Sequence, residues 1–144
     1  MIYLIDTDII IYSLKNYPLV KNNFRKHAND PKTISVITYG ELVFGARKSS
    51  DYHKNIASAH RVSELFPVVE VTKSIMETFA DIKADLQSQG NIIDDMDLLI
   101  AATALTMNYT LVTNNERHFS RIPGLQIENW SIEEGKREEQ EEEE

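Results

Sequence analysis

The 144-residue chain has no cysteine and few glycines, prolines and tryptophans. The absence of cysteine excludes disulfide frameworks, thiol catalysis and zinc–thiolate sites. No apolar run approaches the roughly 20 residues that a membrane-spanning helix needs. The chain also opens without a basic leader and reaches an acid at Asp6, unlike a signal peptide. We therefore expect a cytoplasmic protein with no membrane partner, folded around an ordinary hydrophobic core.

The net charge of −8 is concentrated at the carboxyl end of the chain. Residues 133–144 contain eight acidic and two basic residues, which leaves a net charge of −2 for residues 1–132. A terminal run of like charge is typical of a solvated, disordered tail. We therefore predict one domain over residues 1–132 and an acidic, disordered tail over residues 133–144. The overall acidity does not exclude a polyanionic partner, because it lies in the tail.

Short apolar runs alternate with longer helical patterns along the chain. Strands are predicted where the runs are short and bounded by polar or turn residues, at residues 2–5, 33–37, 68–71, 110–113 and 125–128. Helices are predicted at residues 41–48, 52–65, 75–86 and 98–105. This alternation predicts an α/β fold with a mostly parallel central sheet, in which ligands bind at the carboxyl ends of the strands.

Acidic residues stand where several of these predicted elements meet. Asp6 ends the first strand, Glu41 follows the second and Glu116 follows the fourth, while Asp97, with two aspartates just before it, precedes the apolar helix. Two carboxylates about 4 Å apart repel by roughly 4 kcal/mol at an effective dielectric of 20, so such a cluster needs a counter-charge. A divalent cation with oxygen ligands meets that need, and it predicts metal-dependent phosphodiester hydrolysis.

The same acids also have a purely structural interpretation. Segments 38–41 and 113–116 have the spacing of helix capping boxes. Asp95 and Asp97 would each complement the positive end of a helix. Asp6 is the exception, because an unpaired acid at the end of a buried strand is costly. The coincidence of several acid-bearing segments favours a site over isolated caps.

Five segments of the chain match, in order, the pattern of one nuclease family. They are residues 4–8 (Leu-Ile-Asp-Thr-Asp), 34–46 (Ile-Ser-Val-Ile-Thr-Tyr-Gly-Glu-Leu-Val-Phe-Gly-Ala), 97–102 (Asp-Leu-Leu-Ile-Ala-Ala), 111–119 (Leu-Val-Thr-Asn-Asn-Glu-Arg-His-Phe) and 122–130 (Ile-Pro-Gly-Leu-Gln-Ile-Glu-Asn-Trp). With these residues the chain resembles the PIN-domain ribonucleases, and most closely the VapC toxins of bacterial VapBC toxin–antitoxin systems. The resemblance implies a PIN-like α/β/α sandwich.

The resemblance also implies a Mg²⁺- or Mn²⁺-dependent endoribonuclease. It assigns Asp6, Glu41 and Asp97 as metal ligands and, together with Asn115, as the catalytic set. Asn115 stands where a fourth acid is common in the family, which is a departure from the pattern. A subset of VapC proteins carries the same Thr-Asn-Asn sequence and cleaves initiator tRNA in its anticodon stem-loop, so the analogy points to tRNA as the substrate.

Further residues are expected to contact the substrate. The candidates are Thr7, Thr113, Glu116, Arg47 and Lys48. Arg47 and Lys48 are expected to contact phosphates, and so are Lys54 and Arg61. The partners that the resemblance implies are a VapB-type antitoxin that occludes the site, a second copy of the chain in a homodimer, and the toxin–antitoxin hetero-oligomer that contains both.

Two alternatives remain open at the level of the sequence. Asp6-Thr7-Asp8 after an apolar strand is also similar to the opening motif of haloacid-dehalogenase-type phosphatases, in which the first aspartate is a nucleophile. The second alternative is a non-catalytic PIN-like binding module with a degraded site, for which Asn115 is the support. The phosphatase motif continues with threonine or valine where this chain has Ile10, and its later lysine has no clear counterpart here.

Overall fold

The computed structural model describes residues 1–133, and five short strands form its central sheet. The strands are β1 (Tyr3–Ile5), β2 (Lys32–Ser35), β3 (Val68–Val69), β4 (Thr110–Val112) and β5 (Ile127–Glu128). They pair in the order β3-β2-β1-β4-β5, and every pairing is parallel. The predicted α/β fold with a parallel sheet is confirmed. The order reverses direction beside β1, which is where ligands bind in open α/β sheets.

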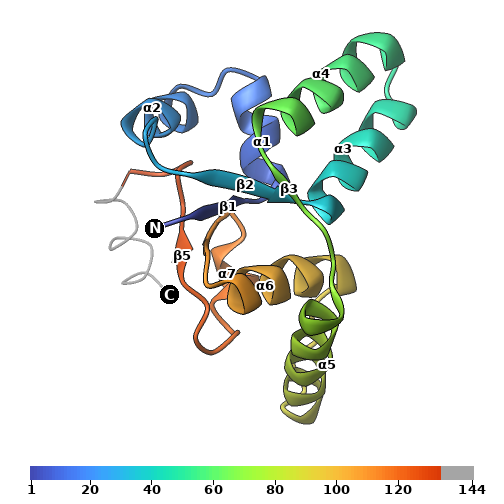
Figure 1. The fold of residues 1–144 in the computed structure, drawn as a ribbon, viewed down its shortest axis with the longest axis vertical. Coiled ribbons are helices and arrows are strands. Elements are labelled where there is room, and N and C mark those ends of the chain that lie inside the picture. The colour runs from blue at the N-terminus through green and yellow to red at the C-terminus, as the bar shows by residue number, and fades with distance from the viewer. Residues whose placement is uncertain (134–144) are drawn as a thin grey trace.

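Seven helices connect these strands within the described residues. They are α1 (Thr7–Leu14), α2 (Pro18–Lys26), α3 (Val36–Lys48), α4 (Tyr52–Leu65), α5 (Lys73–Ser88), α6 (Asp95–Met107) and α7 (Glu116–Phe119). Helices α1 to α4 cover one face of the sheet, and α5 to α7 cover the other (Figure 1). No helix in this part of the chain is both long and apolar enough to span a membrane.

Alternation along the strands divides the hydrophobic core into two layers. Tyr3 and Ile5 pack with α1 to α4 on one face of the sheet, whereas Leu4 packs with α5 and α6 on the other. In β4, Leu111 and Val112 divide in the same way. Because side chains alternate along a strand, both faces of the central strands are buried, and β1 and β4 are apolar at every position except Thr110. The sheet is therefore a rigid frame for the residues that follow its strands.

Several predicted boundaries were wrong at the second strand. The strand predicted over residues 33–37 ends at Ser35, and α3 begins at Val36 rather than near Glu41. The Oγ of Ser35 accepts a hydrogen bond from the backbone N–H of Ile37 at 3.0 Å, so Ser35 is the helix cap. The capping box predicted over residues 38–41 is therefore also wrong. The prediction failed because Val36 and Ile37, at the start of α3, are β-branched residues of the kind that is common in strands.

Three helices were not predicted, namely α1, α2 and the four-residue α7. Helix α1 contains an isoleucine run, Ile9 to Ile11, that has no clear helical or strand period, and α2 is short and mostly polar. Asp6 and Pro18 are the signals that mark their starts, as a capping aspartate and a proline in the first turn. The predicted acidic tail lies outside the described residues, apart from Glu133.

Candidate active site

Asp6 occupies the point at which β1 becomes α1. Its Oδ1 accepts a hydrogen bond from the Thr7 backbone N–H at 2.8 Å, which caps α1. Its Oδ2 accepts a hydrogen bond at 2.7 Å from the hydroxyl of Thr113, which follows β4. The side chain is buried, and this burial, followed by the negative charge of Asp8, raises the pKa of Asp6 to about 7. The adjoining parallel strands thus fix this carboxylate from both sides.

Asp8 lies in the first turn of α1, beside Asp6. Its Oδ1 accepts a hydrogen bond from the Ile9 backbone N–H at 2.7 Å, and its Oδ2 accepts one from the Asn114 backbone N–H at 3.1 Å. Burial raises the pKa of Asp8, and the charges of Asp97 and Glu41 raise it further. Asp8 therefore belongs electrostatically to the same group of acids, although the sequence singled out Asp6 and not Asp8 as a site residue.

Glu41 reaches this group from α3. Its Oε1 accepts a hydrogen bond from the Thr7 hydroxyl at 2.8 Å, and that hydroxyl also lies 3.1 Å from the Oγ1 of the fully buried Thr38. Glu41 itself remains accessible to solvent. Partial desolvation raises its pKa, as does the charge of Asp97. Thr7 thus connects the start of α1 to the carboxylate of α3.

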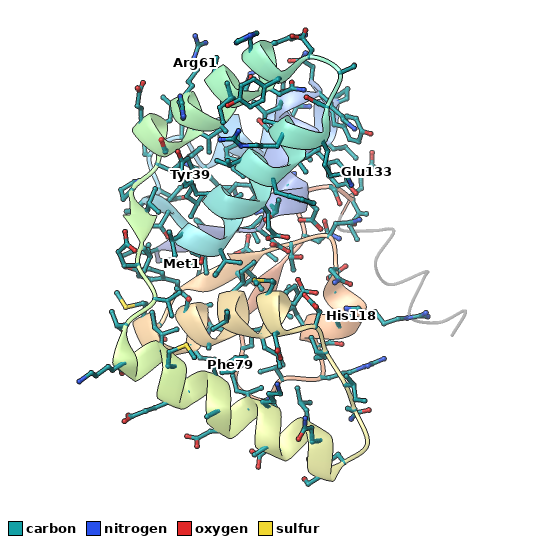
Figure 2. All side chains as sticks on the ribbon, turned by 90° about the vertical axis from the view of Figure 1, so that its right-hand side faces the viewer. Met1, Tyr39, Arg61, Phe79, His118 and Glu133 are labelled. Atoms are coloured by element: carbon teal, nitrogen blue, oxygen red, sulfur yellow. The ribbon has the colours of Figure 1, made fainter. Side chains whose placement is uncertain are left out.

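Asp97 reaches the group from the first turn of α6. Asp94 caps this helix through a 3.2 Å hydrogen bond from the Met96 backbone N–H to its Oδ2. The Nδ1 of His118 lies 3.8 Å from the Oδ2 of Asp97, and Figure 2 shows His118 on α7 beside the amino-terminal end of α6. Burial and the charge of Asp94 raise the pKa of Asp97, whereas His118 lowers it.

The loop after β4 supplies polar side chains around these acids. The Oγ1 of Thr113 accepts a hydrogen bond from the Asn115 backbone N–H at 3.0 Å while it donates to Asp6. The Nδ2 of Asn115 lies 3.0 Å from the Nδ1 of His118, so Asn115 is held near the Asp97 side of the group. Glu116 accepts a hydrogen bond from the Nδ2 of Asn129 at 3.1 Å. Glu116 thus bonds to the segment after β5, and the capping box predicted over residues 113–116 is wrong because Asn115 is the residue before α7.

Asp6, Asp8, Glu41 and Asp97, here called the carboxylate cluster, share one electrostatic property. The pKa of each is raised, and in each case burial is the largest cause. Their hydrogen bonds come from hydroxyls and backbone amides, and the one ion pair described above comes from a histidine. A group of partly desolvated acids that repel one another in this way is an environment that favours the binding of a cation.

The donor chemistry of the cluster suits a hard divalent cation, which prefers carboxylate oxygens. Within residues 1–133, however, no three histidine, aspartate or glutamate side chains are arranged as a ready-made metal site. Asp6 and Asp8 are each fixed by two hydrogen bonds, whereas Glu41 is exposed and accepts one from Thr7, and Asp97 lies beside His118. The residues fit a metal in charge and in donor type, and Glu41 and Asp97, which are less firmly hydrogen-bonded than Asp6 and Asp8, have more freedom to adjust.

The basic residues predicted to contact the substrate lie apart from the cluster. Arg47 and Lys48 are in the last turn of α3, where Arg47 stacks over the Tyr52 ring at 5.4 Å and Lys48 lies 5.3 Å from the centre of the Phe44 ring. Lys54 is closer, because it lines a cavity that Glu41 also lines. His118, which the sequence did not single out as a site residue, lies beside Asp97.

That cavity has a volume of about 410 Å³ and lies between α1, α3 and α4. Its apolar lining comes from Ile11, Leu14 and Leu42, and its charged lining from Lys15, Glu41 and Lys54. Because Glu41 belongs both to the cavity wall and to the carboxylate cluster, a molecule that fills the cavity would reach the acids.

Comparisons with known proteins show the family to which the chain is related. A family model for the PIN domain matches residues 3–125. Ribonuclease VapC1 of Haemophilus influenzae (strain R2866) is 36% identical over 133 residues, which is 91% of this chain and 99% of that protein. The tRNA(fMet)-specific endonuclease VapC of Shigella flexneri is 34% identical over 131 residues, covering 90% of this chain and 98% of that protein.

A solved structure shows the same arrangement of elements. The match is to the crystal structure of VapBC2 from Rickettsia felis bound to a DNA fragment from its promoter, with a TM-score of 0.85 and 34% identity over 90% of this chain and 99% of that one. The haloacid-dehalogenase alternative is wrong, because the family model that matches is that of the PIN domain and the relatives are VapC ribonucleases. The chain belongs to the PIN domain family and, within it, to the VapC ribonucleases.

Proposed function

We propose that this protein is the toxin of a VapBC toxin–antitoxin pair and that it hydrolyses RNA phosphodiester bonds with the help of Mg²⁺ or Mn²⁺. The observation that carries the proposal is the carboxylate cluster, in which four acids from α1, α3, α6 and the end of β1 all have raised pKa values. Without a cation, such a group of acids lowers the stability of the folded protein. Its presence therefore indicates a functional rather than a structural role.

The residues that would hold the metal are Asp6, Asp97 and Glu41, with Asp8 as an addition to the set predicted from the sequence. When bound, a divalent cation lowers the pKa of a water molecule and stabilises charge on a phosphoryl oxygen. Hydrolysis by water leaves a 5′-phosphate and a 3′-hydroxyl on the two RNA fragments. The role of the protein is to hold the acids at one place on a rigid sheet edge.

The surrounding polar residues orient this machinery. Thr7 holds Glu41, and Thr113 holds Asp6, each through a hydroxyl that donates to a carboxylate. Asn115, which is fixed by Thr113, presents its side chain next to His118 and so beside Asp97. We therefore assign Thr7 and Thr113 to positioning of the acids and Asn115 to contact with water or with the phosphate.

The substrate that we propose is transfer RNA, with initiator tRNA as the first candidate. Two relatives, from Shigella flexneri and Salmonella typhimurium, are named tRNA(fMet)-specific endonucleases and are 34% and 32% identical to this chain. The sequence Thr113-Asn114-Asn115 follows the pattern of VapC proteins with that specificity. An anticodon loop is also a suitable substrate for a site at the edge of a sheet, because its unpaired nucleotides can unstack and bind to the protein surface.

The antitoxin that we propose as partner has a defined place to bind. Related solved structures are VapBC complexes. The cavity between α1, α3 and α4 has apolar walls and is also lined by Glu41. An antitoxin segment with apolar side chains for the cavity and a basic group directed at Glu41 would block the carboxylate cluster. We further propose that the toxin forms a homodimer, as small chains commonly pair by twofold symmetry.

The test compares the wild-type protein with Asp6→Asn and with Asp85→Asn, a control on the exposed side of α5. Each is assayed on total tRNA with Mg²⁺ and with EDTA, and each is titrated with Mg²⁺ or Mn²⁺ in a thermal unfolding experiment. We expect Asp6→Asn to lower cleavage by more than about 100-fold. We also expect metal to raise the melting temperatures of the wild type and of Asp85→Asn, and to raise the melting temperature of Asp6→Asn much less.

Undiminished cleavage by Asp6→Asn would remove Asp6 from the mechanism. Metal binding without cleavage of any RNA would favour the remaining alternative, a non-catalytic binding module. A protein truncated after Ile132 tests the predicted division of the chain, because a domain over residues 1–132 should keep its cleavage activity without the tail.

A further inference from the structure

Two tyrosines form a stacked pair at the corner between α1 and α2. Tyr12 lies in α1, and Tyr17 precedes Pro18 at the start of α2. Their ring centres are 4.8 Å apart, and their planes differ by 9°. Tyr17 is 44% exposed, whereas Tyr12 is partly buried. Tyr17 therefore exposes its ring to solvent, and the ring of Tyr12 is stacked against it.

The pair adjoins the carboxylate cluster through Asn114. The Nδ2 of Asn114 donates to the Tyr12 hydroxyl at 3.2 Å, while the backbone N–H of the same residue donates to Asp8 at 3.1 Å. A single residue thus connects the inner ring to an acid of the cluster. Asn129 and Ser131 fix the other end of Asn114, since both donate to its Oδ1, at 3.2 and 2.8 Å. The position of the rings relative to the acids is consequently well determined.

The turn itself does not require an exposed ring. The backbone N–H of Tyr17 donates to the Tyr12 carbonyl at 3.0 Å, and Pro18 fixes the start of α2. The exposed face of Tyr17 thus adds little to the local fold. A flat aromatic face beside a site that acts on a phosphodiester has the chemistry of a base-stacking surface, because every nucleobase has a π-face. Lys15, between the two tyrosines in sequence, adds a positive charge suited to a phosphate.

We propose that Tyr17, supported by Tyr12, is a stacking platform for an unpaired nucleobase of the RNA substrate close to the cleaved bond. This inference rests on the proposed ribonuclease function and deepens it, because it names the part of the substrate that is recognised. The platform selects single-stranded RNA, in which a base can leave its neighbours, and tolerates any base.

The test uses initiator tRNA to map the cleavage position and then a synthetic anticodon stem-loop RNA of the same sequence. Further copies of this RNA carry one abasic residue at successive positions around the cleaved bond. The variants are Tyr17→Leu, which removes the ring, and Tyr17→Trp, which keeps an aromatic face. Tyr109→Leu is the control, since Tyr109 precedes β4 and lies at the opposite edge of the sheet from the site. Melting temperatures confirm that each variant is folded.

We expect Tyr17→Leu to raise KM by about 5- to 100-fold with kcat nearly unchanged, because stacking binds the ground state and the transition state alike. Tyr17→Trp should keep the wild-type KM, and Tyr109→Leu should change it by less than about twofold. One abasic position should raise the wild-type KM by a similar factor and should have no further effect in Tyr17→Leu.

Independent, multiplicative losses from the abasic residue and from Tyr17→Leu would overturn the platform. An unchanged KM in Tyr17→Leu would overturn it as well. If that variant also elutes as a monomer in size-exclusion chromatography, the tyrosine pair is a contact between protein subunits and not a platform for RNA. Should Tyr17→Leu fail to fold, Tyr17→Trp decides the question, because a KM raised like that of an abasic substrate contradicts stacking. A wild-type protein that cleaves no RNA overturns the proposed function and this inference together.

Discussion

Asp6 is a buried carboxylate with a raised pKa, and this shift makes the stability of the protein depend on pH. The pKa of Asp6 is raised from 3.8 to about 7 in the folded protein. Between these values the folded state holds a proton that the unfolded state has released, so the free energy of unfolding falls as the pH rises. The pKa values of Asp8, Glu41 and Asp97 are raised as well, so these acids contribute with the same sign.

We therefore predict that the metal-free protein is less stable at pH 8 than at pH 5, and that Asp6→Asn removes a large part of the difference. One pKa unit corresponds to about 1.4 kcal/mol and only the interval from pH 5 to about 7 counts, so Asp6 contributes at most about 3 kcal/mol to this difference. The measurement is urea unfolding in EDTA across this pH range. Asp85→Asn is the control and should follow the wild-type curve, whereas parallel curves for the wild type and Asp6→Asn would contradict the prediction.

At the same scale, the sequence predicted some members of the carboxylate cluster and missed others. Asp6, Glu41 and Asp97 were selected because they follow or precede predicted elements, and the structure couples them electrostatically. Asp8 was not selected, although it is two residues from Asp6, because only the turn of α1 shows that both acids face the loop after β4. The proximity of His118 to Asp97 depends on the packing of α7 against α6, which no local pattern encodes.

At the scale of elements, α3 shows how one serine decides where a strand ends. The parallel strands were predicted from their composition, but Val36 and Ile37 continue the apolar run of β2 and gave no local signal for a helix. Ser35 ends the strand because its buried side chain accepts the hydrogen bond from the Ile37 N–H. This cap fixes the rotation of α3 and hence the direction in which Glu41 leaves the helix.

We predict that Ser35→Ala lowers the free energy of unfolding by about 1–2 kcal/mol, as expected for the loss of a helix cap. It should also weaken the coupling of Glu41 to Thr7, so cleavage of tRNA should fall at a metal concentration that still saturates the wild type. Asp51→Ala is the matched control, since Asp51 caps α4 through the Lys54 N–H at 3.4 Å but lies away from the cluster. If Asp51→Ala reduced cleavage as much as Ser35→Ala, the effect would reflect stability alone.

At the scale of the whole molecule, charge is divided between the two faces of the sheet. Residues 7–65, which contain α1 to α4, have nine lysines and arginines and five acids, whereas residues 66–107, which contain α5 and α6, have two bases and seven acids. The net charge of −2 for residues 1–132 conceals this separation. A polyanion that approaches the carboxylate cluster is therefore attracted from the α1 to α4 side, where the cavity and the tyrosine pair also lie.

This division predicts that equivalent lysines on the two faces contribute differently to RNA binding. Lys54 lines the cavity beside Glu41, whereas Lys73 begins α5 on the acidic face. Each contact with a phosphate adds about 0.7 to the slope of log KM against log salt for single-stranded RNA. Lys54→Gln should therefore raise KM at low salt and reduce that slope by about this amount, while Lys73→Gln, which changes the net charge equally, should leave the slope unchanged. Equal slopes for both variants would mean that the RNA responds to the total charge of the protein and that the α1 to α4 face does not guide it.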